Sequence, residues 1–78
     1  MPHECPRCAE LSAAVDEVLK KLNTIITDQL AAFRRRDDSA FIRLDKELEL
    51  TIGLKERTIG ALREHRREHG DQNQSKAS

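Results

Sequence analysis

Two pairs of metal-binding residue types lie near opposite ends of this 78-residue sequence. Cys5 and Cys8 form a Cys-x-x-Cys pair, and His65 and His69 form a His-x-x-x-His pair. Two thiolates and two imidazoles make up a tetrahedral shell that Zn²⁺ prefers in structural sites. Histidines four positions apart project from the same face of a helix. The residue types and spacing therefore predict one structural zinc ion, provided that the fold brings both ends of the chain together.

Each half of this ligand set has an alternative interpretation. Cys5 and Cys8 fit a redox dithiol as well, although no βαβ pattern supports a thioredoxin-like fold. His65 and His69 fit solvated residues at the end of a charged helix. His3 is an alternative ligand, although we expect it to be a bystander. A catalytic zinc needs an open coordination position. Four protein ligands leave none, so we expect no enzymatic activity.

A glutamate is expected to support the ligands from outside the coordination shell. Metal-binding histidines usually donate their second ring N–H to a carboxylate or carbonyl. Glu4, Glu64 and Glu68 are the candidates, and the sequence does not choose among them.

The residues between the two ligand pairs predict two long amphipathic helices. Apolar positions that alternate by three and four indicate a first helix at about residues 9–35. Its stripe is Leu11, Val15, Val18, Leu22, Ile25, Gln29 and Ala32. Four further apolar residues widen this stripe beyond what one neighbouring helix covers, namely Leu19, Ile26, Leu30 and Phe33.

A second helix is predicted at about residues 39–69, after a turn at about residues 36–38. Asp38 or Ser39 suits its N-cap, because either side chain can accept from free amides of the first turn. No Gly or Pro marks the turn, so one continuous helix is the alternative. The second apolar stripe is out of phase with the first, which favours a reversal of the chain. It comprises Phe41, Leu44, Leu48, Ile52, Ile59 and Leu62.

An antiparallel hairpin would place the two ligand pairs side by side. Cys8 then lies opposite the neighbourhood of Arg67, and Cys5 lies opposite Gly70. The predicted fold is therefore all-α: a coiled-coil-like antiparallel two-helix hairpin, closed at its open end by zinc, within residues 1–70. Residues 71–78 form a polar tail that we expect to be disordered.

Self-association into a dimeric four-helix bundle is also predicted. Ile42, Leu50 and Leu54 add to the apolar surface that a single helix pair cannot cover. Gly53 and Gly60 are seven positions apart and so share a helix face. They indicate either a locally less stable stretch of the second helix, or a close crossing of this helix with the first helix or with a second subunit. A swapped arrangement, with the cysteines of one chain meeting the histidines of another, fits the same pattern.

Composition narrows the classes of partner. The chain has 14 basic and 14 acidic residues, a balance that argues against general binding of nucleic acid. No apolar run is long enough to cross a membrane, and no leader sequence is evident. We therefore expect a cytoplasmic protein whose two cysteines are ligands or a redox pair rather than a structural disulfide.

For function, we expect a structural or protein-interaction module with a partner that the sequence does not identify. One alternative is a small regulator of transcription or nucleic acid that uses the tip, Arg34–Arg36 with Asp37 and Asp38. The other is a thiol redox or metal-sensing protein.

The tip segment Asp37-Asp38-Ser39-Ala40 loosely resembles the coiled-coil regulators that enter the secondary channel of bacterial RNA polymerase. The acidic tip of that family carries an Asp-x-Ala element, which Asp38 and Ala40 match. The chain has three arginines at its tip and lacks the four-cysteine finger of the family, so it is not assigned to it.

Overall fold

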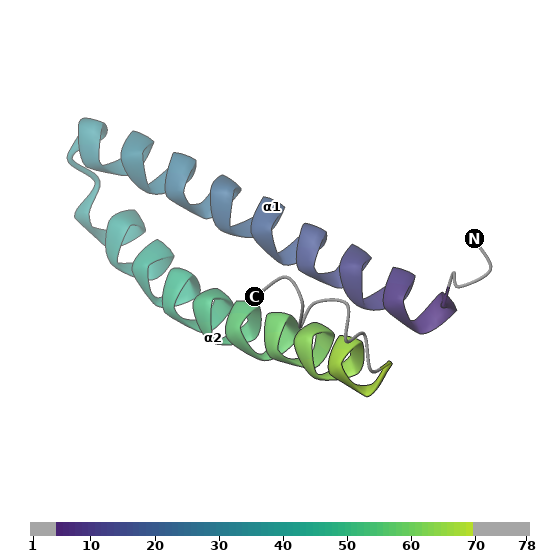
Figure 1. The fold of residues 1–78 in the computed structure, drawn as a ribbon. Helices are drawn as coiled ribbons and strands as arrows, with labels where there is room; N and C mark the ends of the chain where they lie inside the picture. Colours follow the sequence, from purple (N-terminus) through teal and green to yellow (C-terminus); the bar gives the residue numbers. More distant parts are fainter. Residues whose placement is uncertain (1–4, 70–78) are drawn as a thin grey trace, which may run out of the picture.

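The protein is an elongated helical hairpin, shown by a computed structural model that describes residues 5–69 (Figure 1). Helix α1 spans Pro6–Arg35 and helix α2 spans Asp38–Glu68, and the two pack against each other along their lengths. The described residues form no strand. The prediction of an all-α hairpin is thus confirmed. The predicted tail at 71–78, together with His3 and Glu4, lies outside the described residues.

Helix α1 begins three residues before the predicted start at Ala9, because Pro6 opens it. Proline is well tolerated at the first position of a helix, where its missing N–H would have no partner. Cys5 is the N-cap, with extended backbone, and its carbonyl accepts the first intrahelical bond from the Ala9 amide at 3.1 Å. The Cys-x-x-Cys pair therefore sits at the start of α1 rather than before it.

The turn between the helices ends α1 with a left-handed residue that is not glycine. Arg36 has φ 62° and ψ 34°. Its amide donates to the Phe33 carbonyl at 3.0 Å, and the next amide, of Asp37, donates to the Ala32 carbonyl at 2.9 Å. This pair of bonds is the Schellman motif, which satisfies the last carbonyls of a helix. The chain reverses here without Gly or Pro because the motif holds Arg36 in a conformation that glycine adopts more readily.

The N-cap of α2 is Asp37, one residue before the positions predicted from the sequence. The Asp37 carboxylate accepts a hydrogen bond from the Ala40 amide at 3.1 Å. Asp38 is the first residue of the helix and adds negative charge to its first turn, where the helix dipole favours an anion.

The two helices meet along a seam, the row of side chains on each helix that faces the other. On α1 the seam is the predicted stripe, with a buried residue at every seventh position: Leu11, Val18, Ile25 and Ala32. On α2 the predicted stripe is wrong at one position. Thr51 is buried at 5% exposure, whereas Ile52 is 40% exposed. Leu48 is four positions after Leu44, and Thr51 is three positions after Leu48, so Thr51 continues the row that faces α1. Ile52 is one residue further, and its side chain is therefore turned about 100° away from that row.

Apolar packing is concentrated toward the turn. One core cluster there contains Ile25, Ala32, Ala40 and Leu44, with Phe41 and Leu48 packed against it. In its middle, the seam of α2 carries Thr51, Lys55 and Thr58, which are buried or half-buried, and Leu62 is buried beyond them. The hydrophobic effect, which scales with buried apolar area, thus holds the helices together less strongly in the middle of the hairpin than near the turn.

The two glycines of α2 do not mark a close crossing with α1. A methyl group placed on Gly60 would meet nothing within 4 Å, and one on Gly53 would meet only the end of the Arg57 side chain at 3.8 Å. The predicted crossing with the first helix is therefore wrong. Each glycine lowers the stability of α2 by about 1 kcal/mol relative to alanine, because glycine has a poor helix propensity.

Within residues 5–69, neither helix combines the length and the apolar character that crossing a membrane requires.

The turn geometry predicts opposite effects for the same substitution at neighbouring positions. Arg36→Gly should stabilise the hairpin by about 1 kcal/mol, because glycine adopts positive φ without the steric penalty of a side chain. Arg34→Gly, inside the last turn of α1, should destabilise it by about 0.5–1 kcal/mol. Urea unfolding of the metal-saturated proteins measures both changes. If Arg36→Gly destabilised the hairpin as much as Arg34→Gly does, the left-handed conformation of Arg36 would be contradicted.

Candidate metal centre

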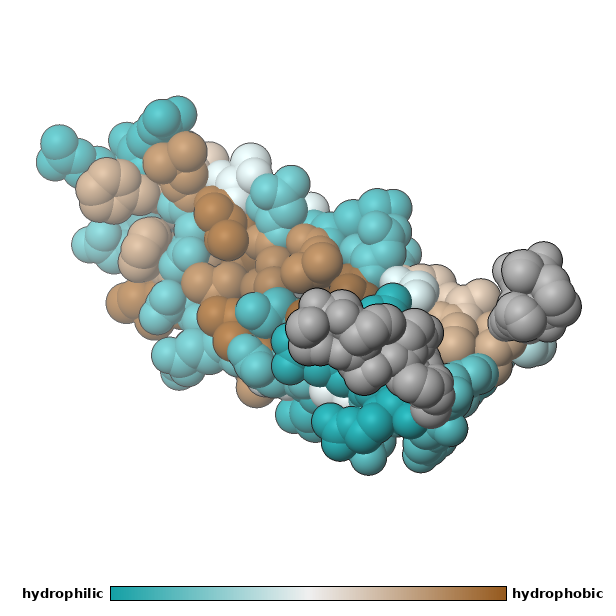
Figure 2. Space-filling view, in the orientation of Figure 1, coloured by the Kyte–Doolittle hydropathy of each residue, from teal (hydrophilic) through white to brown (hydrophobic). Residues whose placement is uncertain are grey.

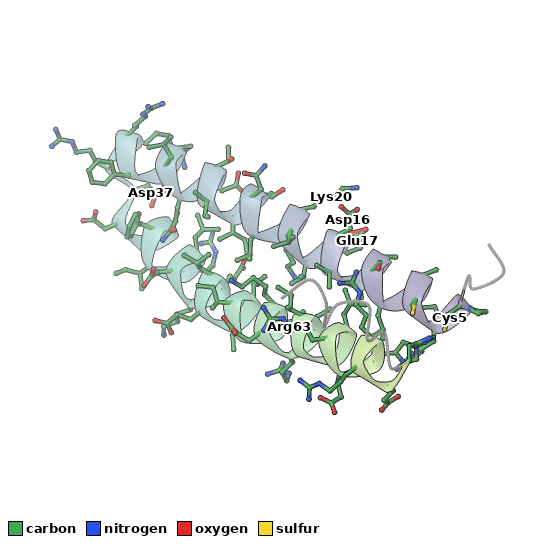
Figure 3. The ribbon with its side chains drawn as sticks, in the orientation of Figure 1. Cys5, Asp16, Glu17, Lys20, Asp37 and Arg63 are labelled. Carbon is green, nitrogen blue, oxygen red and sulfur yellow. The ribbon has the colours of Figure 1, made fainter. Side chains whose placement is uncertain are left out.

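Four side chains converge at the open end of the hairpin. The Sγ atom of Cys5 lies 3.3 Å from Nε2 of His65, and the Sγ atom of Cys8 lies 3.6 Å from Nε2 of His69. The two Nε2 atoms are 3.1 Å apart. All four ligand atoms fall within 4.8 Å of one another. These residues therefore lie close enough together to bind one metal ion, and Figure 3 shows Cys5 beside the end of α2.

The distances match the edges of a metal-centred tetrahedron. With bonds of about 2.3 Å to sulfur and about 2.0–2.1 Å to nitrogen, tetrahedral geometry separates a sulfur from a nitrogen by about 3.6 Å and two nitrogens by about 3.3 Å. The measured separations are 3.3 and 3.6 Å for the two sulfur–nitrogen pairs and 3.1 Å for the nitrogen pair. The arrangement needs only small movements to hold an ion of this size.

Local helical structure positions each ligand pair. Cys5 at the N-cap and Cys8 in the first turn of α1 lie where free amides and the helix dipole favour a thiolate. His65 and His69 are one turn apart at the end of α2, and their rings meet edge to face with centroids 4.7 Å apart. Because both rings direct Nε2 toward the thiols, their Nδ1 atoms are left to other partners.

Glu68 is the candidate carboxylate that lies beside a ligand histidine. Its Oε1 is 3.8 Å from Nδ1 of His65, which is longer than a hydrogen bond. A closer approach would favour the tautomer with a proton on Nδ1, which leaves the Nε2 lone pair available for a metal. Of the other candidates, Glu64 pairs with Arg67 at 3.5 Å, and Glu4 lies outside the described residues. The spacing of three between His65 and Glu68 was the only sequence signal for this contact.

The thiol of Cys5 is acidified by its neighbours. Its contact with the His65 ring is the largest cause that lowers the pKa of Cys5 from 9.0 to about 6, and the backbone amide of Cys8 acts in the same direction. Partial burial opposes this shift of the pKa but is the weaker effect. Cys5 is therefore mostly thiolate at neutral pH even before a metal binds, and thiolate is the form that metals require.

The charged tip lies at the other end of the molecule from these ligands. Arg35 contacts the Asp37 carboxylate at 3.7 Å, and Asp37 also caps α2. Arg34 and Arg36 are exposed and flank an open hollow with Phe33 and Asp38. The ligands and the tip are thus separated by the full length of the hairpin (Figure 1).

Comparisons with protein-family models, with curated proteins and with solved structures found no significant match to this chain.

The lowered pKa of Cys5 predicts how the metal-free protein reacts with an alkylating agent. Alkylation of Cys5 should have a midpoint near pH 6, because its thiolate fraction falls as the pH drops through the pKa of about 6. The substitution His65→Gln removes the contact that lowers the pKa of Cys5 most, so it should move this midpoint up toward 9.0. Peptide mapping by mass spectrometry after iodoacetamide treatment isolates Cys5.

The same shift fixes the pH dependence of the metal-free fold. Because the folded pKa is depressed, the thiolate's contribution to stability is fully present above about pH 9 and is lost as the pH falls through about 6. An alkylation midpoint of Cys5 near 9 in the unsubstituted protein would contradict the contact with His65.

Proposed function

We propose that this chain is a zinc-stapled helical interaction module, in which one Zn²⁺ binds Cys5, Cys8, His65 and His69. The observation that supports this proposal is the convergence of two thiols and two imidazoles, from opposite ends of the chain, within 4.8 Å. Glu68, with its Oε1 3.8 Å from the second nitrogen of His65, would supply the outer support common at zinc sites by a movement of under about 1 Å.

The donor set is what selects zinc in this proposal. Two sulfurs and two nitrogens in a tetrahedron suit Zn²⁺, whereas Mg²⁺ and Ca²⁺ take oxygen ligands in larger shells. Four protein ligands close the shell and leave no position for a substrate or an activated water. The ion in this proposal is therefore structural, and the chain has no catalytic activity of its own.

The staple holds together the open end, where the buried apolar seam ends at Leu11 and Leu62. Lys55 and Thr58, in the middle of the α2 seam, bury less apolar surface than the cluster near the turn. Metal binding that occurs only in the folded chain adds directly to folding stability, by about 10 kcal/mol or more in small zinc domains at neutral pH. With its open end closed, the hairpin presents a fixed helical surface to a protein partner, and we propose a homodimeric four-helix bundle as its assembled form.

Metal binding is tested by comparing two histidine substitutions. His69→Ala removes a ligand and should lower zinc affinity by more than the roughly 10–100-fold that loss of an outer-shell partner costs, while His3→Ala should leave it unchanged. Elemental analysis should give one zinc per chain for the unsubstituted protein. Competition with a chromophoric chelator measures affinity, and circular dichroism with and without a strong chelator measures the dependence of folding on metal.

Two results would overturn this proposal. One is the absence of bound zinc after purification under reducing conditions and incubation with the metal. The other is the same thermal unfolding temperature in metal-free and zinc-loaded samples, since a ligand that binds only the folded state must raise it.

A metal or redox sensor is the second candidate function. The observations that favour it are the partial exposure of both cysteines and the thiolate character of Cys5. Hydrogen peroxide would oxidise the two thiolates to a Cys5–Cys8 disulfide, with two protons taken up and two waters formed. The two sulfurs would then no longer serve as thiolate ligands, and zinc would be released.

Peroxide treatment separates the sensor from an inert staple. A sensor should release its zinc to a colorimetric indicator at low millimolar peroxide, and a thiol reductant should restore binding. Alkylated Cys5 serves as the control that cannot be restored. Retention of zinc throughout the treatment would exclude the sensor and leave the structural role in place.

The third candidate, a regulator of transcription or nucleic acid acting through Arg34–Arg36, stays a proposal without a specific contact in its favour. Loss of partner binding on charge reversal at these three residues would support it.

A further inference from the structure

The hairpin exposes a set of large apolar side chains outside its seam. Among residues 5–69, eight of them are 40–76% exposed, and they lie between residues 19 and 54, on both sides of the turn. Figure 2 shows brown surface running over both helices on the face toward the viewer. Single exposed apolar residues are common, but a contiguous patch on a small protein marks an interaction site.

Six of these side chains share one face, which we name the apolar face. Leu19, Ile26 and Phe33 each directly follow a buried seam residue of α1, and Ile52 directly follows the buried Thr51 of α2. In antiparallel helices, positions that follow the seam lie on the same side of the pair. On α1 this side continues one turn beyond Ile26 to Leu30. On α2 it includes Ile42, which follows the half-buried Phe41 and lies ten positions before Ile52, and these two residues complete the apolar face.

Leu50 and Leu54 lie on the opposite side. Leu50 directly precedes the seam residue Thr51, and Leu54 directly precedes the half-buried Lys55. Residues that precede the seam project away from the apolar face. The described residues of α1 offer no large exposed apolar side chain on that opposite side, so only one face is apolar on both helices.

The apolar rows of the two helices lie at matching heights. The contact of Gln29 with Asp45 and that of Phe33 with Phe41 fix which residues face each other. By this register, Ile42 lies close to the height of Phe33, and Ile52 lies between the heights of Leu19 and Ile26. A matching partner surface would present two antiparallel helices whose apolar rows lie at the same heights along the helix axes. The apolar face of a second copy of this chain has this arrangement.

We infer that the apolar face is the contact surface for a second copy of this chain, with the two turn-proximal halves packed on each other. Six half-exposed side chains of this size give about 500–600 Å² of apolar surface per copy, which meets the roughly 500 Å² per partner that a biological interface needs. Among residues 5–69, the hairpin alone leaves no large side chain fully buried. Its formal net charge of zero adds no long-range repulsion between two copies.

This inference rests on the proposed interaction module, but it needs the helix pair and not the metal ligands. The residues of the apolar face are at least 11 positions away from Cys8 and more than ten from His65. Assembly state and zinc content can therefore be measured separately in the same samples, so that failure of one proposal is distinguishable from failure of the other.

The test places a charge on either face and compares the outcomes. Ile26→Glu introduces a carboxylate at the centre of the apolar face, and Ile52→Glu does so from the other helix. Leu50→Glu is the matched control, because Leu50 is 76% exposed on the opposite side. All three positions are already exposed in the hairpin, so circular dichroism should show unchanged helicity. Zinc-loaded samples are studied by sedimentation equilibrium across micromolar concentrations.

The unsubstituted protein and Leu50→Glu should be dimers. Ile26→Glu and Ile52→Glu should raise the dimer dissociation constant about a hundredfold or more, because an unpaired carboxylate resists burial, and both should still bind one zinc per chain. A monomeric unsubstituted protein, or dimers that survive both substitutions on the apolar face, would overturn the inference. Dissociation by Leu50→Glu alone would place the interface on the other side.

Discussion

The register between the two helices is the constraint on which the metal centre depends. Buried residues recur every seven positions along α1, and the seam of α2 advances by threes and fours, so the helices stay in contact from the turn to the open end. A shift of one residue on either helix would move a side chain by about 1.5 Å along the axis and turn it by about 100°. Cys8 would then face away from His69. The Schellman turn at Arg36 sets this register at one end, and the four ligands meet at the other.

Apolar packing holds the two helices together near the turn, and the metal ligands lie at the open end. Near the turn, Ile25, Ala32 and Leu44 form an apolar cluster that holds the helices together. Farther out, Thr51 and Lys55 take seam positions where apolar residues would pack better. A two-helix protein of this size has little core, and small domains commonly add a metal or a disulfide for this reason. The four ligands lie just beyond Leu11 and Leu62, where the buried apolar seam ends, and this placement fits that physical need.

Much of this arrangement could be predicted from the sequence, because its strongest signals are local. Residue types and spacing identified Cys5, Cys8, His65 and His69, and the change of phase between the two apolar stripes indicated the reversal. Other features depend on tertiary context. Ile52 is more apolar than Thr51, yet the spacing of the seam buries Thr51. Likewise, Arg36 adopts a left-handed conformation only because the bonds around it hold the turn, and the choice of Glu68 required the orientation of the His65 ring.

X-ray absorption at the zinc edge tests the central claim most directly, because it reads the identity and distance of the atoms bound to the metal. The zinc-loaded protein should show two sulfur neighbours at about 2.3 Å and two nitrogen neighbours at about 2.0–2.1 Å, with multiple-scattering features of imidazole. A six-coordinate shell of oxygen and nitrogen without sulfur would contradict the account. So would a shell of one sulfur, since Cys5 and Cys8 would then not share the ion with His65 and His69.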